Sequence, residues 1–128
     1  MAVTHVNPES LHTNPAFSQA TVVEPGTRLV FVGGQNGVDA GGEVVSDELG
    51  PQTEQALRNL LTVLEAAGAS QEHVAKLTIH VVAGADMREG FAASAKVWGH
   101  HATAITVLTV AGLANPHYLV EIDAIAAL

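Results

Sequence analysis

A chain of 128 residues is long enough to bury a sizeable core, and we expect a single domain over residues 1–128. Apolar residues make up 48% and charged residues 14%, which excludes a disordered chain and predicts an exposed apolar patch that drives self-association. The net charge of −8 disfavours nucleic acid and anionic membranes as partners, while the absence of cysteine, signal peptide and apolar spanning segment predicts a cytoplasmic protein.

The N-terminal part of the chain predicts strands. Residues 1–16 are rich in Asn, Pro, Ser and His, and we expect an irregular segment with one short strand near Thr4–Asn7. Ser18–Glu24 and Arg28–Gly34 are β-branched, apolar segments separated by the turn dipeptide Pro25-Gly26. We therefore expect these two segments to form a hairpin.

The first helix is marked by a stripe of leucines at helical spacing, Leu57, Leu60, Leu61 and Leu64. Pro51 suits the first helical position, and Gly68 suits the position just after the helix end. The sequence therefore predicts a helix from about residue 51 to residue 67.

The C-terminal half predicts a strand, a second helix and two further strands. The strand covers Val74–Val82, and the helix begins at Asp86-Met87-Arg88-Glu89, a variant of the capping box, and ends at Gly99. The inward stripe of this helix is expected to be Met87, Phe91, Ala95 and Trp98. The final strands are expected at about Ala104–Val110 and Tyr118–Ala127.

The element order β-β-α-β-α-β-β does not alternate strictly, which favours an α+β fold over a doubly wound one. We expect a mixed sheet with two helices on one face. The opposite face then needs a cover that the remaining sequence does not provide, and self-association supplies one.

Five segments together resemble the Rid family (RidA/YjgF, also called the endoribonuclease L-PSP family) over roughly residues 15–127. They are Phe17–Ala20, Phe31–Gln35, Val74–Thr78, Thr103–Thr106 and Glu121–Ala126. The resemblance implies a Rid or chorismate-mutase-like fold and a homotrimer whose sheets line a central barrel. It also implies a small-molecule ligand bound in three clefts between subunits. Nothing in the sequence indicates a cofactor.

The resemblance also implies site residues, and one of them departs from the family pattern. In the deaminase branch a Pro-Ala-Arg-Ser segment supplies an arginine for the substrate carboxylate, but this chain has Ile105 there. The aromatic residue near the start of the family's pattern, usually Tyr, corresponds to Phe17, and Phe91 is the nearest match to an Asn of the second helix.

Two further parts of the implied site match the family's pattern, the first of them in part and the second in full. The Ser-Gly-Gln turn of the family corresponds to Gly33, Gly34 and Gln35, and its backbone groups are implied to face the substrate. The carboxylate thought to hold the attacking water in the deaminases corresponds to Glu121.

These residues predict a changed substrate. Without a guanidinium, a buried substrate carboxylate has no charge-assisted partner, so 2-imino acids should be poor substrates. If Glu121 is buried beside Phe17, Phe91 and Ile105, it can act as a general acid or base on a neutral imine or enamine. The alternatives are that Glu121 is a solvated or interface residue and that both phenylalanines belong to the core.

Three classes of function stay open. The favoured class is a hydrolytic small-molecule enzyme that is not a typical 2-imino-acid deaminase. The second is a non-catalytic trimer that binds a small ligand or regulates a partner, and the third is the ribonuclease and translation-inhibitor activity in the family's older name. None of the seven histidines has metal-ligand spacing, so we expect no metal site.

Overall fold

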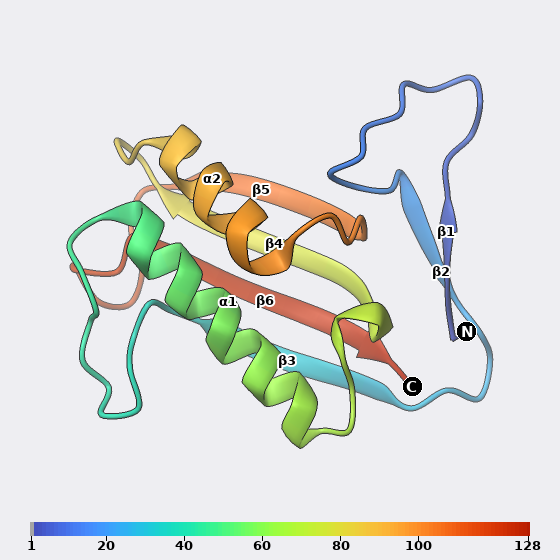
Figure 1. The fold of residues 1–128 in the computed structure, drawn as a ribbon, viewed down its shortest axis with the longest axis horizontal. Helices are drawn as coiled ribbons and strands as arrows, with labels where there is room; N and C mark the ends of the chain where they lie inside the picture. Colours follow the sequence, from blue (N-terminus) through green and yellow to red (C-terminus); the bar gives the residue numbers. More distant parts are fainter. Residues whose placement is uncertain (1) are drawn as a thin grey trace.

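The computed structural model describes residues 2–128, in which two helices pack on one face of a four-stranded sheet (Figure 1). A separate two-stranded sheet stands beside it. The elements in chain order are β1 (Val3–Val6), β2 (Ala20–Val23), β3 (Leu29–Gln35), α1 (Leu49–Ala66), the short 3₁₀ helix η1 (Gln71–His73), β4 (Val74–Val82), α2 (Met87–Trp98), β5 (Ala104–Val110) and β6 (Val120–Ala127). The α+β class predicted from the sequence is confirmed.

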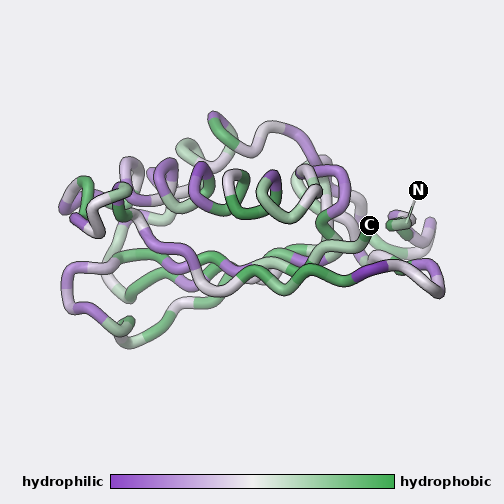
Figure 2. Tube along the Cα trace, turned by 90° about the horizontal axis from the view of Figure 1, so that it is seen from below, coloured by the Kyte–Doolittle hydropathy of each residue, from purple (hydrophilic) through white to green (hydrophobic). Residues whose placement is uncertain are grey.

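The larger sheet has the strand order β3-β6-β4-β5 and is mixed. The neighbours β4 and β5 run parallel and are joined through α2, whereas β6 runs antiparallel to both β3 and β4. Both helices lie on the same side of this sheet, as the view along its plane shows (Figure 2). This is the predicted mixed sheet with helices on one face.

The predicted hairpin between the second and third strands is wrong. Strand β2 pairs with β1, and β3 pairs with β6. The Thr21 hydroxyl donates to the carbonyl of Ala75 at 2.6 Å, which directs β2 toward the start of β4. Strand β2 therefore lies away from the edge of β3, although only five residues separate the two strands.

Helix α1 forms where the leucine stripe predicts it. Leu57, Leu60 and Leu64 are fully buried against the sheet. The helix begins two residues earlier than expected, so Pro51 occupies its third position, where a missing N–H still costs no helical hydrogen bond. Gly68 has φ of 79° and, together with the bond from the Ala69 N–H to the Leu64 carbonyl, ends the helix as expected.

Helix α2 begins as predicted, but its inward face differs. The Asp86 carboxylate accepts a hydrogen bond from the Arg88 N–H, and Gly99 ends the helix with φ of 71°. Trp98 is buried, but Phe91 is 58% exposed and Ala95 is also exposed, so the predicted inward stripe is wrong at these two positions. Met87 packs on the core as predicted, but the helix is rotated so that Ala93 is buried and Val97 packs on the core in place of Phe91 and Ala95.

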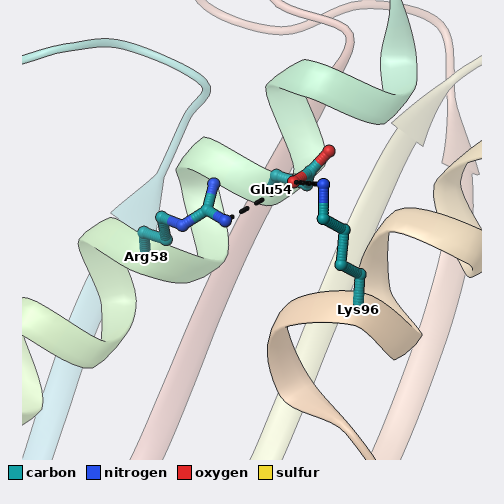
Figure 3. Close-up of polar contacts among 3 residues, drawn as sticks. All are labelled: Glu54, Arg58 and Lys96. Atoms are coloured by element: carbon teal, nitrogen blue, oxygen red, sulfur yellow. Dashed lines mark ion pairs between the residues drawn. The ribbon is translucent and has the colours of Figure 1, made fainter.

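Three charged side chains connect the two helices on their outer surface (Figure 3). The Glu54 carboxylate lies 3.0 Å from the Lys96 ammonium of α2 and 3.5 Å from the Arg58 guanidinium one turn along α1. The hydrogen bond with Lys96, assisted by the positive charges of Lys96 and Arg58, lowers the pKa of Glu54 below 4.5. The cluster is exposed to solvent, so it orients α2 on α1 more than it stabilises the fold.

The two faces of the sheet differ in composition. The face toward the helices is apolar and includes Leu77, Val81 and Ile122. On the opposite face, which we call the open face, β4 presents Lys76, Thr78 and His80 and β3 presents Phe31, which is 71% exposed. Among residues 2–128, no helix has the length and apolar character needed to cross a bilayer.

Candidate functional site

The carboxylate of Glu121 lies on the open face, near the start of β6. Its neighbours in the strand, Val120 and Ile122, are fully buried toward the helices, so the alternation of the strand directs Glu121 to the opposite side. The Glu121 side chain itself is half-buried. A charged side chain in the middle of a sheet therefore keeps access to solvent in the single chain.

Gly34 makes room for this carboxylate. Strand β3 has an irregularity in its pairing with β6 between Val32 and Gln35, and Gly34 lies within it. A Cβ atom at Gly34 would lie 2.6 Å from Cδ of Glu121, which is closer than two such atoms can approach. The absence of a side chain at position 34 is therefore what allows Glu121 to occupy its position.

A chain of amide side chains holds Glu121 from the α1 side. The Asn36 Nδ2 group donates to the Val120 carbonyl at 3.0 Å and to Glu121 Oε1 at 3.3 Å. The Asn59 Nδ2 group in turn donates to the Asn36 carbonyl at 3.2 Å. The Gln55 Nε2 group donates to Asn59 Oδ1 at 2.8 Å. Helix α1 therefore fixes the loop after β3, and that loop orients the carboxylate.

His80 lies beside Glu121 on the neighbouring strand. The two residues are directly opposite in the β4–β6 pairing, and His80 Nδ1 lies 3.1 Å from the backbone carbonyl of Glu121. A carbonyl only accepts, so Nδ1 carries a proton and donates it to this bond. The site thus combines a carboxylate, an imidazole and an amide donor.

Glu121 has no cation to neutralise it within residues 2–128. The Lys76 ammonium, on the same face, donates to Thr106 Oγ1 at 2.5 Å, and none of the ion pairs involves Glu121. The carboxylate is therefore oriented by an amide and has no ion-pair partner in this part of the chain.

The site residues expected from the sequence lie in three parts of the single chain. Gly34, Gln35 and Glu121 come together where β3 and β6 pair. Ile105 packs against the core on the helix side of the sheet, and Phe91 is exposed on α2.

Phe17 lies on a third part of the chain, the segment between β1 and β2. The next residue, Ser18, donates from its N–H to the Thr103 carbonyl and from its hydroxyl to the Ala102 carbonyl. The chain next to Phe17 is therefore attached to the segment just before β5, where Thr103 precedes Ile105 by two positions. Within one chain, these residues do not line a common cleft with Glu121.

Asn36, Asn59 and His80 are not among the site residues predicted from the sequence. Asn59 lies within the helix predicted over residues 51–67, and His80 lies within the strand predicted at Val74–Val82. The residue opposite His80 depends on the strand register, which no local pattern of residues determines. Among residues 2–128, no group of three metal-ligating side chains comes together.

The family model named Endoribonuclease L-PSP matches residues 8–128, and the chain belongs to this family, which includes the Rid proteins. The structure of the Rid protein YyfB from Yersinia pestis, described as of unknown function, superposes with a TM-score of 0.89 at 33% identity over the full length of both chains. The structure of the Escherichia coli YjgF gene product gives a TM-score of 0.69 at 30% identity over 87% of each chain.

Two curated relatives give a similar result. A RutC family protein of Pyrococcus horikoshii is 34% identical over 111 residues, which cover 86% of this chain and 85% of the relative. A rat protein named 2-iminobutanoate/2-iminopropanoate deaminase is 38% identical over 65 residues, 50% of this chain and 45% of its own length. The match to this named enzyme spans less than half of it.

Proposed function

We propose that this protein is a Rid-type hydrolase that acts on a neutral imine or enamine, with Glu121 as the group that accepts a proton from the attacking water. The observation that carries the proposal is the carboxylate of Glu121, oriented by the Asn36 amide at 3.3 Å and free of an ion pair within residues 2–128. A general base needs this combination of a fixed position and an available lone pair.

The reaction balances with water as the only second reactant. The water oxygen bonds to the imine carbon while Glu121 takes one water proton and passes it to the imine nitrogen, which becomes an amine. Glu121 then takes the proton of the new hydroxyl group and passes it to the same nitrogen while the carbon–nitrogen bond breaks. The products are ammonia and a carbonyl compound, and Glu121 is again a carboxylate.

Ile105 supports a substrate without a carboxylate. Its aliphatic side chain packs against the core and offers no hydrogen bond. A substrate carboxylate beside it would lose its hydration without a compensating charge. The negative charge of Glu121 would add repulsion in any site that contains both groups.

We propose a homotrimer, in which site residues that lie apart in one chain meet between subunits. The open face carries Phe31 and other exposed apolar side chains, such as Leu29 and Leu108, which a second copy would cover. We propose that Phe17, Phe91 and Ile105 of one subunit line a cleft with Gly34, Gln35 and Glu121 of a neighbour. Such a cleft would be polar at Glu121 and apolar elsewhere.

A neutral aldimine, generated in place by a flavin amine oxidase from benzylamine, tests the proposal. We expect this protein to accelerate ammonia release above the spontaneous rate, and Glu121→Gln to reduce that acceleration about 10²-fold, the usual effect of losing a general base. Asp123→Asn is the matched control, because it removes a carboxylate two residues along the same strand face. Full activity of Glu121→Gln would overturn the role of Glu121.

The alternative is a non-catalytic trimer that binds a small ligand, and the 58% exposure of Phe91 favours it because an exposed aromatic side chain is a common ligand contact. In that case, ligand binding would be measurable by calorimetry without turnover of any imine. The ribonuclease activity in the family's name is disfavoured by the net charge of −8, since phosphate binding needs clustered Lys and Arg.

A further inference from the structure

Two histidines meet where the segment between β1 and β2 is attached to the rest of the molecule. The rings of His5, on β1, and His101, just before β5, pack edge to face with their centroids 5.7 Å apart, and we call this pair the histidine contact. The Ser18 hydroxyl lies 2.9 Å from His5 Nδ1. This hydroxyl donates its single proton to the Ala102 carbonyl at 2.8 Å, so its bond with the ring requires a proton on Nδ1 of His5. The Ser18 N–H donates to the Thr103 carbonyl at 2.9 Å, which adds a second bond to the chain just before β5.

The second imidazole of the contact is buried at one of its nitrogens. His101 Nε2 is buried and has no hydrogen-bond partner among residues 2–128. A neutral ring can keep its one proton on Nδ1, whereas a charged ring carries a proton on both nitrogens. In the charged ring, the Nε2–H group would be a buried donor without an acceptor, which is unfavourable. Protonation of His101 therefore opposes the position that its ring occupies.

The groups around His101 do not compensate a positive charge on its ring. Burial lowers the pKa of His101, His5 of β1 lowers it further, and the charge of Glu72 on η1 opposes the change. Glu72 takes part in none of the ion pairs of residues 2–128. Trp98, at the end of α2, contacts the ring edge to face, and its Nε1–H donates to the His101 carbonyl at 2.9 Å, not to the ring. The neighbouring His100 is exposed.

We propose that the histidine contact makes the attachment of residues 7–19 depend on pH. With His101 neutral, the two rings pack and the Ser18 bonds hold the segment in place. Protonation of both rings in mild acid would place two positive charges at the contact, together with a buried donor that has no acceptor. His101 would then leave its buried position, and residues 7–19 would separate from the chain just before β5.

The separation would be confined to this segment. The start of β1 stays in place because Val3 is buried with Ala75 and Ala127, and β2 is held by the bond from the Thr21 hydroxyl to the Ala75 carbonyl. Phe17 lies in the segment that separates, so mild acid would also lower the proposed imine hydrolysis if Phe17 lines the cleft. That consequence rests on the proposed function, whereas the pH-dependent attachment does not.

Amide hydrogen exchange in the full-length protein, followed by NMR from about pH 7.5 to about pH 5, measures the attachment directly. The protection factor of the Ser18 N–H, corrected for the pH dependence of the intrinsic exchange rate, should fall about tenfold or more over this range. The N–H of Leu60, in the buried part of α1, should retain its protection. Trp98 is the only tryptophan and its ring lies 6.1 Å from that of His101, so its fluorescence should change over the same range.

Three variants assign the change to the two rings. His101→Phe keeps an aromatic ring that cannot be protonated, so the protection of Ser18 should vary by less than about twofold over the same pH range. His5→Gln, which keeps a donor for the Ser18 hydroxyl without a charge, should make the fall in protection smaller. His100→Phe, at the exposed neighbouring position, is the matched control and should show the wild-type fall.

Three results would overturn the inference, and none of them depends on an imine substrate. The first is a protection factor of Ser18 that does not change with pH in the wild type. The second is a loss of protection at Leu60 together with Ser18, which would indicate unfolding of the whole domain. The third is a full wild-type fall in His101→Phe.

Discussion

The Glu89 carboxylate of α2 caps the first turn of α1, because its Oε1 accepts a hydrogen bond from the Gly50 N–H at 2.7 Å. Glu48, the residue that precedes α1, provides no side-chain hydrogen bond, and the first turn of α1 contains no acidic residue. A helix N-terminus is stabilised by a negative charge and by an acceptor for its free N–H groups. Glu89 supplies both from α2, so the stability of the first turn of α1 depends on the position of α2.

Removal of this cap should destabilise the protein. We expect Glu89→Ala to lower the free energy of unfolding by about 1–2 kcal/mol, the usual cost of losing a helix cap, as measured by urea denaturation. Glu89→Gln, which retains an acceptor without the charge, should cost less.

The cap can be verified independently at position 50. A Cβ atom at Gly50 would lie 2.8 Å from Glu89 Oε1, so Gly50→Ala should be destabilising in the wild type and less so in the Glu89→Ala background. If the changes in unfolding free energy of the two substitutions are simply additive, positions 50 and 89 are not coupled, which would contradict the cap.

Gln52 joins two loops to α1, and its replacement should be costly. This fully buried side chain donates to the carbonyls of Ser46 and His117 at 2.8 and 2.9 Å and accepts from the Leu119 N–H at 2.9 Å. Gln52→Leu leaves three backbone groups without a partner, and we expect a loss of about 3 kcal/mol in unfolding free energy. Gln55→Leu, which removes one partly buried hydrogen bond, should cost no more than about 1 kcal/mol. Similar losses in the two variants would contradict this role of Gln52.

Gly34→Ala should affect the proposed site more than stability. The added methyl group would displace the Glu121 carboxylate, whereas the backbone at Gly34 does not have the positive φ that only glycine adopts readily. We expect imine hydrolysis to fall about tenfold or more, because a displaced base loses its alignment with water. Gly33→Ala is the control, because a Cβ atom at Gly33 would have no other atom within 4 Å, and this variant should retain activity.

Ile105→Arg tests the substrate preference directly. We expect the wild type to be weak on 2-imino acids made by serine or threonine dehydratase, and the variant to gain about tenfold or more through a charge-assisted pair with the substrate carboxylate. Ile105→Ala separates the effect of the guanidinium from that of lost packing, because Ile105 contacts the core. High activity of the wild type on these acids would contradict the electrostatic argument.

His101 should make stability depend on pH. Burial lowers the pKa of His101 from its ordinary value of about 6.5, the neighbouring His5 of β1 lowers it further, and the charge of Glu72 opposes the change. Because the unfolded state takes up this proton first, the free energy of unfolding should fall as pH drops from about 6.5 toward the lowered pKa and level off below it. His101→Leu should flatten this slope, whereas His100→Leu, at the exposed neighbouring position, should not. Urea denaturation at pH values from about 4.5 to about 8 measures how the free energy of unfolding depends on pH.

Features with local causes were predictable from the sequence. The leucine spacing determined α1, Gly68 determined its end, and the β-branched run Val74–Val82 determined β4, because helical and extended periodicities differ and few residues other than glycine adopt positive φ. The α+β class followed from the order of these elements.

Pairing between distant segments was decided by the tertiary structure. Strand β2 lies against β1 and not β3, Phe91 faces solvent and not the core, and Asn36 reaches Glu121 from 85 positions earlier in the chain. Strand register and helix rotation depend on how several elements pack against one another, and no local sequence pattern contains this information. The sequence by itself therefore determined the elements and singled out Glu121 and Ile105, whereas only the tertiary structure placed these two residues on opposite faces of the sheet.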